Sequence, residues 1–94
     1  MDTRAFEGTW TKDGNGVVVT VVITNTGWTA KVADSIYNSG THTYNGDEAQ
    51  CEISNKGRGS ANVGETGSAK IDNGKMTVSN FSDHWMNGTY SKYN

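Results

Sequence analysis

Cys51 is the only cysteine of this 94-residue chain, and with the two histidines it offers the simplest nucleophilic chemistry. A catalytic thiol needs a base within hydrogen-bond reach and donors that stabilise an oxyanion. His42 and His84 are far apart in the sequence, and no acidic residue is spaced to orient either ring. Cys51 falls on an inward position of an alternating segment, where a free cysteine usually behaves as a small apolar residue. We therefore expect no catalytic residues and a protein that is not an enzyme.

The same side chains make a poor metal site. His42, His84 and Asp83 lack the close spacing of zinc ligands, and a single thiol cannot build a zinc cluster. The glycine-rich stretches GNG (14–16) and GRG (57–59) have no predicted helix after them, so we interpret them as turns and not as phosphate-binding loops. We expect neither a metal nor another cofactor.

Aromatic residues in two longer connections offer a better functional candidate. Loops often carry function, and exposed aromatic residues mark binding surfaces. If the connections 34–39 and 80–85 lie at the same end of the fold, they form an aromatic rim suited to a small apolar or aromatic ligand, a glycan or a protein partner. The predicted rim consists of Ile36, Tyr37, Phe81, His84 and Trp85. The alternative is structural: Phe81 and Trp85 fold back to cover the interior, and Ile36 tucks into its mouth.

A second candidate is the stretch SNKGRGS at residues 54–60. It is rich in glycine, carries two basic side chains and is expected to protrude. A rigid domain that presents an extended loop can inhibit a protease, because a preorganised loop loses little entropy on docking. The predicted inhibitory residues are Asn55, Lys56, Gly57, Arg58 and Gly59. The alternative is a flexible hairpin tip whose Lys56 and Arg58 are solvated.

Charge and hydropathy narrow the class of partner. The formal net charge is −2, and the lysines and arginines are scattered. No basic stripe is present to neutralise phosphates, which disfavours nucleic acid. The longest apolar run, residues 17–23, contains Thr20 and is far shorter than the ~20 residues that a membrane span needs. The abundance of Asn, Thr, Gly and Ser favours a secreted, periplasmic or cell-surface protein, and a cytoplasmic one remains open.

Alternation with a period of two recurs along almost the whole chain, which predicts an all-β domain. Turn sequences such as NGD (45–47) and DNGK (72–75) separate the alternating stretches. Short strands at this spacing, joined by tight turns, indicate an antiparallel meander. The expected strands are residues 7–12, 17–24, 28–33, 40–45, 48–54, 60–64, 67–72, 75–79 and 86–92.

The two ends of the chain are near copies of each other: FEGTWTK at residues 6–12 and MNGTYSK at residues 86–92. An open meander would expose two strand edges, and pairing its first and last strands removes both. We therefore predict a single domain, residues 1–94, in which about eight strands close into a compact barrel. Val18 and Val22 would face outward, which favours a homodimer contact. The expected core consists of Trp10, Val19, Val21, Ile23, Trp28, Ala30, Val32, Tyr44, Cys51, Ile53, Val63, Ile71, Met76, Val78 and Tyr90.

FEGTWT resembles the first strand of lipocalin-like and avidin-like barrels, the calycin group, in which a tryptophan follows a glycine by two positions. Four stretches are similar to small bacterial lipocalin-like proteins that have an N-terminal GTW strand and a C-terminal NGTYxK strand. They are GTWTKD (8–13), SGTHTYNGDEAQCEI (39–53), KIDNGKMTVS (70–79) and NGTYSK (87–92). The resemblance implies an all-β lipocalin-like barrel, a secreted binding protein or lipoprotein, and a Trp10 that plugs the closed barrel end. The chain departs from long lipocalins in its much shorter strands, which argue against a roomy ligand cavity and leave open whether the interior is filled.

Overall fold

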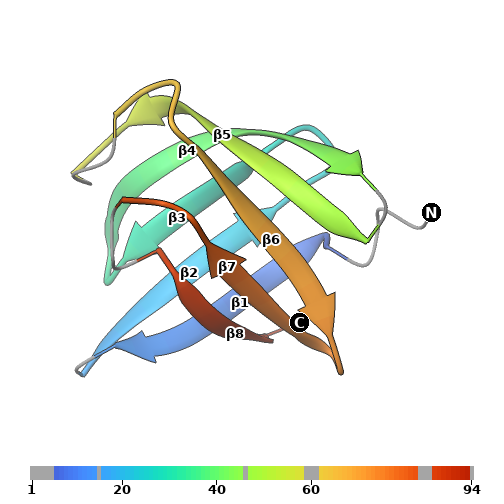
Figure 1. Ribbon diagram of the computed structural model, residues 1–94. Helices are drawn as coiled ribbons and strands as arrows, with labels where there is room; N and C mark the ends of the chain where they lie inside the picture. The colour runs from blue at the N-terminus through green and yellow to red at the C-terminus, as the bar shows by residue number, and fades with distance from the viewer. Residues whose placement is uncertain (1–5, 15, 46, 59–61, 83–85, 94) are drawn as a thin grey trace.

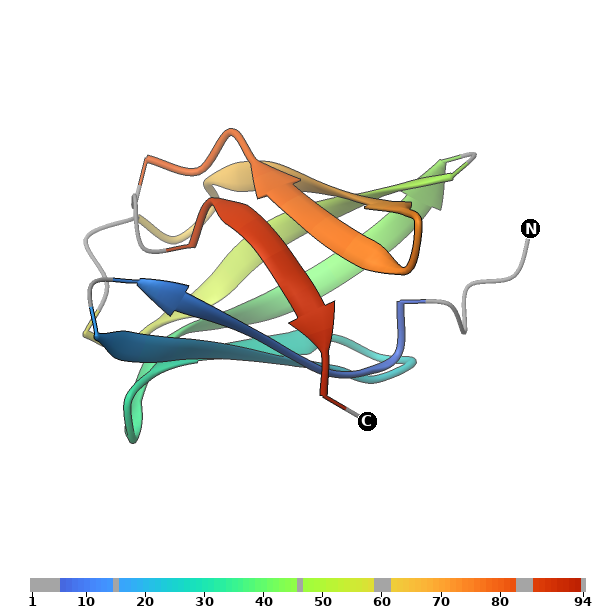
Figure 2. The same ribbon diagram turned by 90° about the horizontal axis from the view of Figure 1, so that it is seen from below.

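Eight antiparallel strands make up the fold of the computed structural model, which describes residues 6–14, 16–45, 47–58, 62–82 and 86–93. The strands are β1 (Gly8–Gly14), β2 (Val17–Ile23), β3 (Trp28–Val32), β4 (Ser35–Asn45), β5 (Glu48–Lys56), β6 (Thr66–Asp72), β7 (Lys75–Ser79) and β8 (Gly88–Lys92). Each strand pairs with its neighbours in sequence, and β1 also pairs with β8, so the sheet closes (Figures 1 and 2). The predicted all-β fold, an antiparallel meander closed into a barrel, is confirmed.

The barrel closes where the two similar ends of the chain meet. In the ladder between β1 and β8, Trp10 lies opposite Lys92 and Thr11 lies opposite Ser91. The Lys92 ammonium nitrogen lies 5.3 Å from the centre of the Trp10 ring, a distance at which cation–π attraction acts. The predicted pairing of the first and last strands is therefore confirmed.

Lys12 fills the seam beside these pairs. Its ammonium group donates to the Asn87 carbonyl oxygen at 2.5 Å and lies 5.7 Å from the centre of the Tyr90 ring. Gly88 has a φ of +138°, and a Cβ atom there would come within 3.1 Å of the Lys12 ammonium nitrogen. Glycine at position 88 therefore leaves the room that the lysine side chain occupies.

The barrel interior holds an apolar core. Side chains alternate between core and surface along each strand, and on β2 this buries Val19, Val21 and Ile23. Val32, Tyr44, Cys51 and Ile71 are partly buried and pack against the core. The buried apolar side chains of the described residues are Phe6, Trp10, Val19, Val21, Ile23, Trp28, Ala30, Ala49, Ile53, Ala69, Met76, Val78, Phe81, Met86 and Tyr90. The predicted core is confirmed except at Val63.

Val63 was wrongly predicted to be in the core, since its side chain is 61% exposed. It lies in the connection between β5 and β6, where a turn replaces the predicted strand over the described residues 62–64. The Gly64 N–H donates to the Ile53 carbonyl oxygen at 2.8 Å, and the Glu65 N–H donates to the Asn62 carbonyl oxygen at 3.1 Å. These bonds reverse the chain and leave the valine outside.

The connection predicted at residues 34–39 is also wrong, because β4 begins at Ser35. Ala33 adopts a positive φ of 54°, and a two-residue turn joins β3 to β4. Ile36 then lies opposite Lys31 in the ladder between these strands. The segment that was expected to be a loop is therefore a paired strand.

Alternate connections of an antiparallel meander lie at the same end of its barrel. The connections β1–β2, β3–β4, β5–β6 and β7–β8 therefore share one end, which we call the turn end. The opposite end, where β1 begins and β8 ends, is called the terminal end. Both segments predicted to carry the aromatic rim thus reach the turn end.

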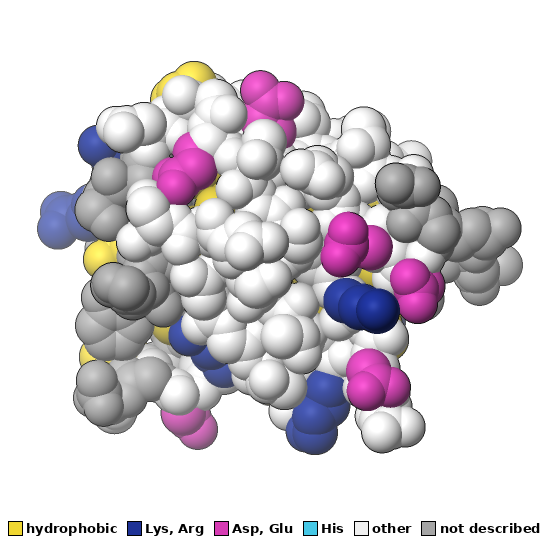
Figure 3. Space-filling model, viewed as in Figure 1, with side chains coloured by type: hydrophobic (Ala, Val, Ile, Leu, Met, Phe, Trp, Pro, Cys, Tyr) yellow, Lys and Arg dark blue, Asp and Glu magenta, His cyan; other side chains and the backbone are white. Residues whose placement is uncertain are grey.

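The outer surface is mostly polar. Figure 3 shows acidic and basic side chains scattered among uncharged ones on one face. Val18 on β2 is 44% exposed and Val22 on the same strand is half-buried, and a homodimer contact through them stays a prediction. Within the described ranges, no helix is long and apolar enough to cross a membrane.

Candidate functional site

The longest hairpin of the barrel brings the two predicted surface sites together. β4 has 11 residues and β5 has 9, whereas the other strands have 5 to 7. At the turn end, the Gly57 N–H donates to the Tyr37 carbonyl oxygen at 2.8 Å, and the Arg58 N–H donates to the Ile36 carbonyl oxygen at 3.0 Å. Ile36 and Tyr37 of the candidate rim and Gly57 and Arg58 of the candidate inhibitory loop therefore lie side by side. We call residues 35–39 and 54–58 the hairpin arm.

The backbone of the hairpin arm is paired on both of its strands. Ser39 lies opposite Asn55 and Asn38 lies opposite Lys56, so β5 continues into the stretch that was predicted to be a loop. An ideal Cβ atom at Gly57 would overlap the Ile36 carbonyl oxygen, so glycine permits this close approach of the two chains. The arm is thus a ladder as far as Lys56, and the bend at Gly57 and Arg58 is joined to β4 by two further hydrogen bonds.

The side chains of the arm combine apolar and basic groups. Ile36 is 52% exposed, and Tyr37 is half-buried. Of the other predicted members of the two sites, His84, Trp85 and Gly59 lie outside the described residues. The exposed residues in the second segment of the arm are Ser54, Asn55, Lys56, Gly57 and Arg58.

Two β-bulges interrupt the pairing of the hairpin arm with its neighbouring strands. Register shifts interrupt both ladders of β4, between Ala30 and Lys31 on one side and between Ser39 and Gly40 on the other. A bulge opposes two residues to one and re-aims the side chains that follow it. Asn38, between the two shifts, is a fully buried polar side chain in the apolar core.

Phe81 does not belong to an exposed rim, because its side chain is only 5% exposed. Its ring centre lies 6.0 Å from that of Trp28, with the planes tilted by 57°. An added Cβ atom at Gly67 on β6 would overlap the Phe81 ring, so the glycine makes space for it. This geometry matches the alternative in which Phe81 covers the interior.

Side-chain hydrogen bonds hold the described parts of the β7–β8 connection. The Asn87 amide donates to the Phe81 carbonyl oxygen at 2.7 Å and accepts from the Phe81 N–H at 3.1 Å. The Glu65 carboxylate, from the β5–β6 connection, accepts from the Ser82 N–H at 2.8 Å and from the Ser82 hydroxyl at 3.1 Å. The Ser82 hydroxyl and N–H lower the pKa of Glu65, because they stabilise its charged form. Two neighbouring connections of the turn end are thereby tied together.

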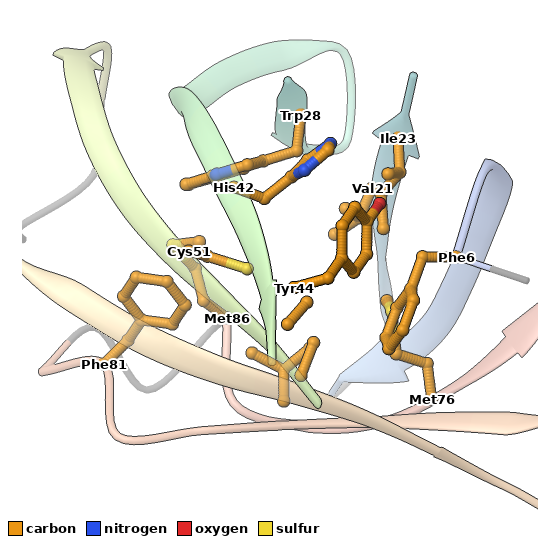
Figure 4. A pocket seen from close by; sticks show the side chains of 13 residues that line it. Phe6, Val21, Ile23, Trp28, His42, Tyr44, Cys51, Met76, Phe81 and Met86 are labelled. Atoms are coloured by element: carbon orange, nitrogen blue, oxygen red, sulfur yellow. The ribbon is translucent and has the colours of Figure 1, made fainter. Parts of the chain in front are cut away.

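The barrel interior is nearly filled. The space open to the centre of a water-sized sphere is about 20 Å³. By that measure one water needs roughly 10–15 Å³, whereas pockets for drug-sized ligands have volumes of about 300–1,000 Å³. Figure 4 shows Phe6, Trp28, Tyr44 and Phe81 among the side chains around this space. Among the residues that the structure describes, the interior therefore has no roomy cavity.

Cys51 and His42 lie opposite each other in the β4–β5 ladder, and both line the cavity. Burial raises the pKa of Cys51 to about 11, so little thiolate exists at neutral pH. The His42 Nε2 atom lies 2.8 Å from the Thr24 carbonyl oxygen, and it must donate because a carbonyl only accepts. The pair therefore lacks the activated thiolate that a cysteine nucleophile needs. Among the residues that the structure describes, no His, Cys, Asp and Glu side chains gather in a group of three or more to hold a metal.

A scan against protein-family models and searches of curated proteins and of solved structures found no match to this chain. The closed eight-stranded barrel is consistent with a lipocalin-like architecture. Kinship with the calycin group is therefore a proposal that rests on the sequence motifs and on this barrel.

Proposed function

We propose that this chain is a non-catalytic binding module that holds a partner at the turn end of its barrel, on the hairpin arm. The observation that carries the proposal is the pair of hydrogen bonds between residues 36–37 and residues 57–58, which joins an apolar and a basic surface. A calycin-type barrel that presents such an arm suits a secreted, periplasmic or cell-surface binding protein.

The chemistry of the arm favours a partner that carries acidic groups beside an apolar one. Burial of the exposed Ile36 side chain contributes apolar contact, and the cations of Lys56 and Arg58 attract carboxylates or sulfates. The ladder hydrogen bonds hold the backbone in place before binding, so docking costs less conformational entropy. A protein surface or an acidic glycan has this combination of groups. The nearly filled interior favours such a surface partner over a large enclosed ligand.

Protease inhibition is the second candidate, and the same ladder supports it. Residues 55–58 are exposed. Asn55 and Lys56 pair with β4, and the Gly57 and Arg58 N–H groups donate to the carbonyl oxygens of Tyr37 and Ile36. Proteases bind many inhibitors and substrates as extended strands, so a fixed strand is preorganised for that mode. The basic Lys56 and Arg58 would then face acidic groups of the protease.

Matched substitutions test whether the arm is the binding surface. Ile36→Ser and Arg58→Ala change the arm, whereas Val18→Ser and Lys70→Ala change an exposed β-branched apolar residue and an exposed basic residue outside the arm. Binding is screened on an array of neutral and acidic glycans and on a panel of cysteine and serine proteases, and then measured by surface plasmon resonance. We expect a loss of at least about tenfold in affinity, or ~1.4 kcal/mol, for each arm variant and less than about twofold for each control.

The panel also separates the two candidates. Saturable inhibition of a protease that Arg58→Ala weakens supports the inhibitor, and glycan binding without inhibition supports the binding module. Equal losses in the arm variants and in the Val18→Ser and Lys70→Ala controls would show that the arm is not the binding surface.

A further inference from the structure

The two strands that close the barrel diverge toward the turn end. In the described part of the chain, the ladder between β1 and β8 consists of Trp10 opposite Lys92 and Thr11 opposite Ser91. The end of β1 and the start of β8 lie beyond this ladder, and Figures 1 and 2 show them moving apart. The seam between the strands therefore widens on its way to the turn end.

A groove follows this seam on the outer surface of the barrel, and we call it the seam groove. The space in it that is open to the centre of a water-sized sphere is about 620 Å³, compared with about 20 Å³ in the barrel interior. Ligand pockets have volumes of about 300–1,000 Å³, so the seam groove has the size of a binding site. The residues that line it are Thr11, Lys12, Asp13, Val18, Gly88, Thr89, Ser91 and Tyr93.

The polar side chains of the seam groove offer both donors and acceptors. The Asp13 carboxylate accepts hydrogen bonds, and the hydroxyls of Thr11 and Thr89 both donate and accept. The Ser91 hydroxyl accepts from the Lys75 ammonium group at 2.9 Å, so its own O–H can donate to a ligand oxygen. Such an array suits a compound that carries hydroxyl groups on neighbouring carbon atoms.

The groove also offers apolar surface. Tyr93 is 72% exposed and Val18 is 44% exposed, and both line the groove. The Tyr93 N–H donates to the Thr9 carbonyl oxygen at 2.6 Å, which ties the backbone of this tyrosine to β1. An exposed tyrosine ring combines a large apolar face with a polar tip. A sugar ring matches this combination, because it presents C–H groups on its faces and hydroxyls around its edge.

We propose that the seam groove binds a neutral oligosaccharide, whose C–H face packs on Tyr93 and whose hydroxyls pair with Asp13, Thr89 and Ser91. Lys12 and Asp13 bring one charge of each sign, so the groove gives an ion no net attraction and favours an uncharged ligand. Four residues of extended chain separate Thr89 from Tyr93, which is roughly 13 Å at about 3.4 Å a residue. That length favours several linked sugar units. The seam groove and the hairpin arm share no residue, so this proposal does not depend on the arm.

Three neutral trisaccharides serve as probes: cellotriose, maltotriose and chitotriose in its N-acetylated form. Binding is measured from the NMR shifts of the amide groups of Thr89, Ser91 and Tyr93 during titration, and the amides of Gly57 and Arg58 report on the arm. We expect saturable shifts at the groove with at least one probe and none at the arm. The acidic analogue of cellotriose, oxidised to a carboxylate on each sugar, should bind at least about fivefold more weakly than cellotriose, because its carboxylates meet that of Asp13.

Variants with matched controls assign the binding to the groove. Tyr93→Ala should weaken it at least about tenfold, whereas Tyr93→Phe, which keeps the ring, should stay within about twofold. Asp13→Asn should weaken binding about fivefold, because a charged acceptor makes a stronger hydrogen bond than a neutral one. Asp34→Asn changes an exposed acid outside the groove and should have no effect, and Arg58→Ala in the arm should have none either.

The proposal is overturned if none of the three trisaccharides gives saturable shifts at the groove. Equal losses in Asp13→Asn and Asp34→Asn, or in Tyr93→Ala and Tyr93→Phe, would also overturn it. A third contrary outcome is a dimer in analytical ultracentrifugation together with groove amides that shift with protein concentration. A second copy of the chain would then cover the groove. Since the arm takes no part in these measurements, each of these outcomes leaves the proposed function of the arm untouched.

Discussion

Replacing Gly67 by alanine tests whether Phe81 belongs to the core, and hence whether the turn end has an exposed aromatic rim. The added methyl group would overlap three carbon atoms of the Phe81 ring, which is almost fully buried and has little room to move. Overpacking of a core costs about 1–3 kcal/mol, and replacing glycine by alanine within a strand recovers about 0.5–1 kcal/mol. We therefore expect a net loss of about 1 kcal/mol in the free energy of unfolding, within a range of roughly 0–2.5 kcal/mol.

Urea denaturation followed by tryptophan fluorescence measures this loss. Trp28 is a suitable reporter, because its ring contacts Phe81. Phe81→Leu removes part of the ring, and it should relieve the overlap in the double variant Gly67→Ala/Phe81→Leu. The two substitutions should then couple favourably, by about 0.5–3 kcal/mol, with unchanged slopes of free energy against urea.

A neutral or stabilising Gly67→Ala, together with no coupling to Phe81→Leu, would refute this reasoning. It would mean that the Phe81 side chain does not pack against β6 and that it is exposed at the turn end, as the predicted aromatic rim requires. A destabilising Gly67→Ala that is not relieved by Phe81→Leu would show that the methyl group meets another part of the structure.

Three further experiments test other features of the fold. Hydrogen bonds from Ser82 hold the pKa of Glu65 low in the folded state, so their stabilisation is present above the ordinary glutamate pKa and is lost as the pH falls through the folded-state value. Glu65→Gln should therefore lower the urea midpoint at neutral pH and match the wild type in acid, and an equal difference at both pH values would contradict this. Cys51 should react slowly with a thiol reagent at neutral pH in the folded protein and rapidly in guanidinium, since burial raises its pKa to about 11, and a fast folded-state reaction would contradict this. Lys12→Met should cost about 1.5–3 kcal/mol, as expected for a hydrogen bond from a charged group, and more than Lys92→Met, whose cation–π contact is worth about 0.5–1 kcal/mol. Equal urea midpoints for these two variants would argue against a stabilising Lys12 hydrogen bond at the seam between β1 and β8.

The fold could be predicted from the sequence wherever side chains alternate without interruption. β2 and β7 have almost the predicted bounds, and the repeated GTWTK and GTYSK phrases correctly indicated that β1 and β8 pair. The prediction failed at the base of the hairpin arm, where β-bulges break both ladders of β4. A bulge adds one residue to a strand, and this extra residue disguises the period of two on which the prediction depended.

The candidate site was predictable only in part, for a related reason. Residues 36–37 and 57–58 could be singled out by type, but their contact depends on how far the hairpin extends beyond the bulges. The positions of His42 and Tyr44 at the interior space were easier to predict, because alternation in the stretch THTY already places both side chains on one face. The contact of His42 Nε2 with the carbonyl oxygen of Thr24, a residue of a different connection, is not indicated by any local pattern.

Tryptophan emission can distinguish binding at the hairpin arm from a change in the barrel interior. Trp10 and Trp28 are both buried in the core, and Trp28 lines the interior cavity, whereas the described residues of the hairpin arm include no tryptophan. In a Trp85→Phe variant, which leaves Trp10 and Trp28 as the only tryptophans, a change in the packing of the barrel interior should alter the tryptophan emission. A partner on the arm should leave the emission nearly unchanged while it alters the amide signals of Gly57 and Arg58. A ligand that changes both would show that the arm and the interior are coupled, most directly through β4, which carries Ile36 and Tyr37 near one end and His42 and Tyr44 near the other.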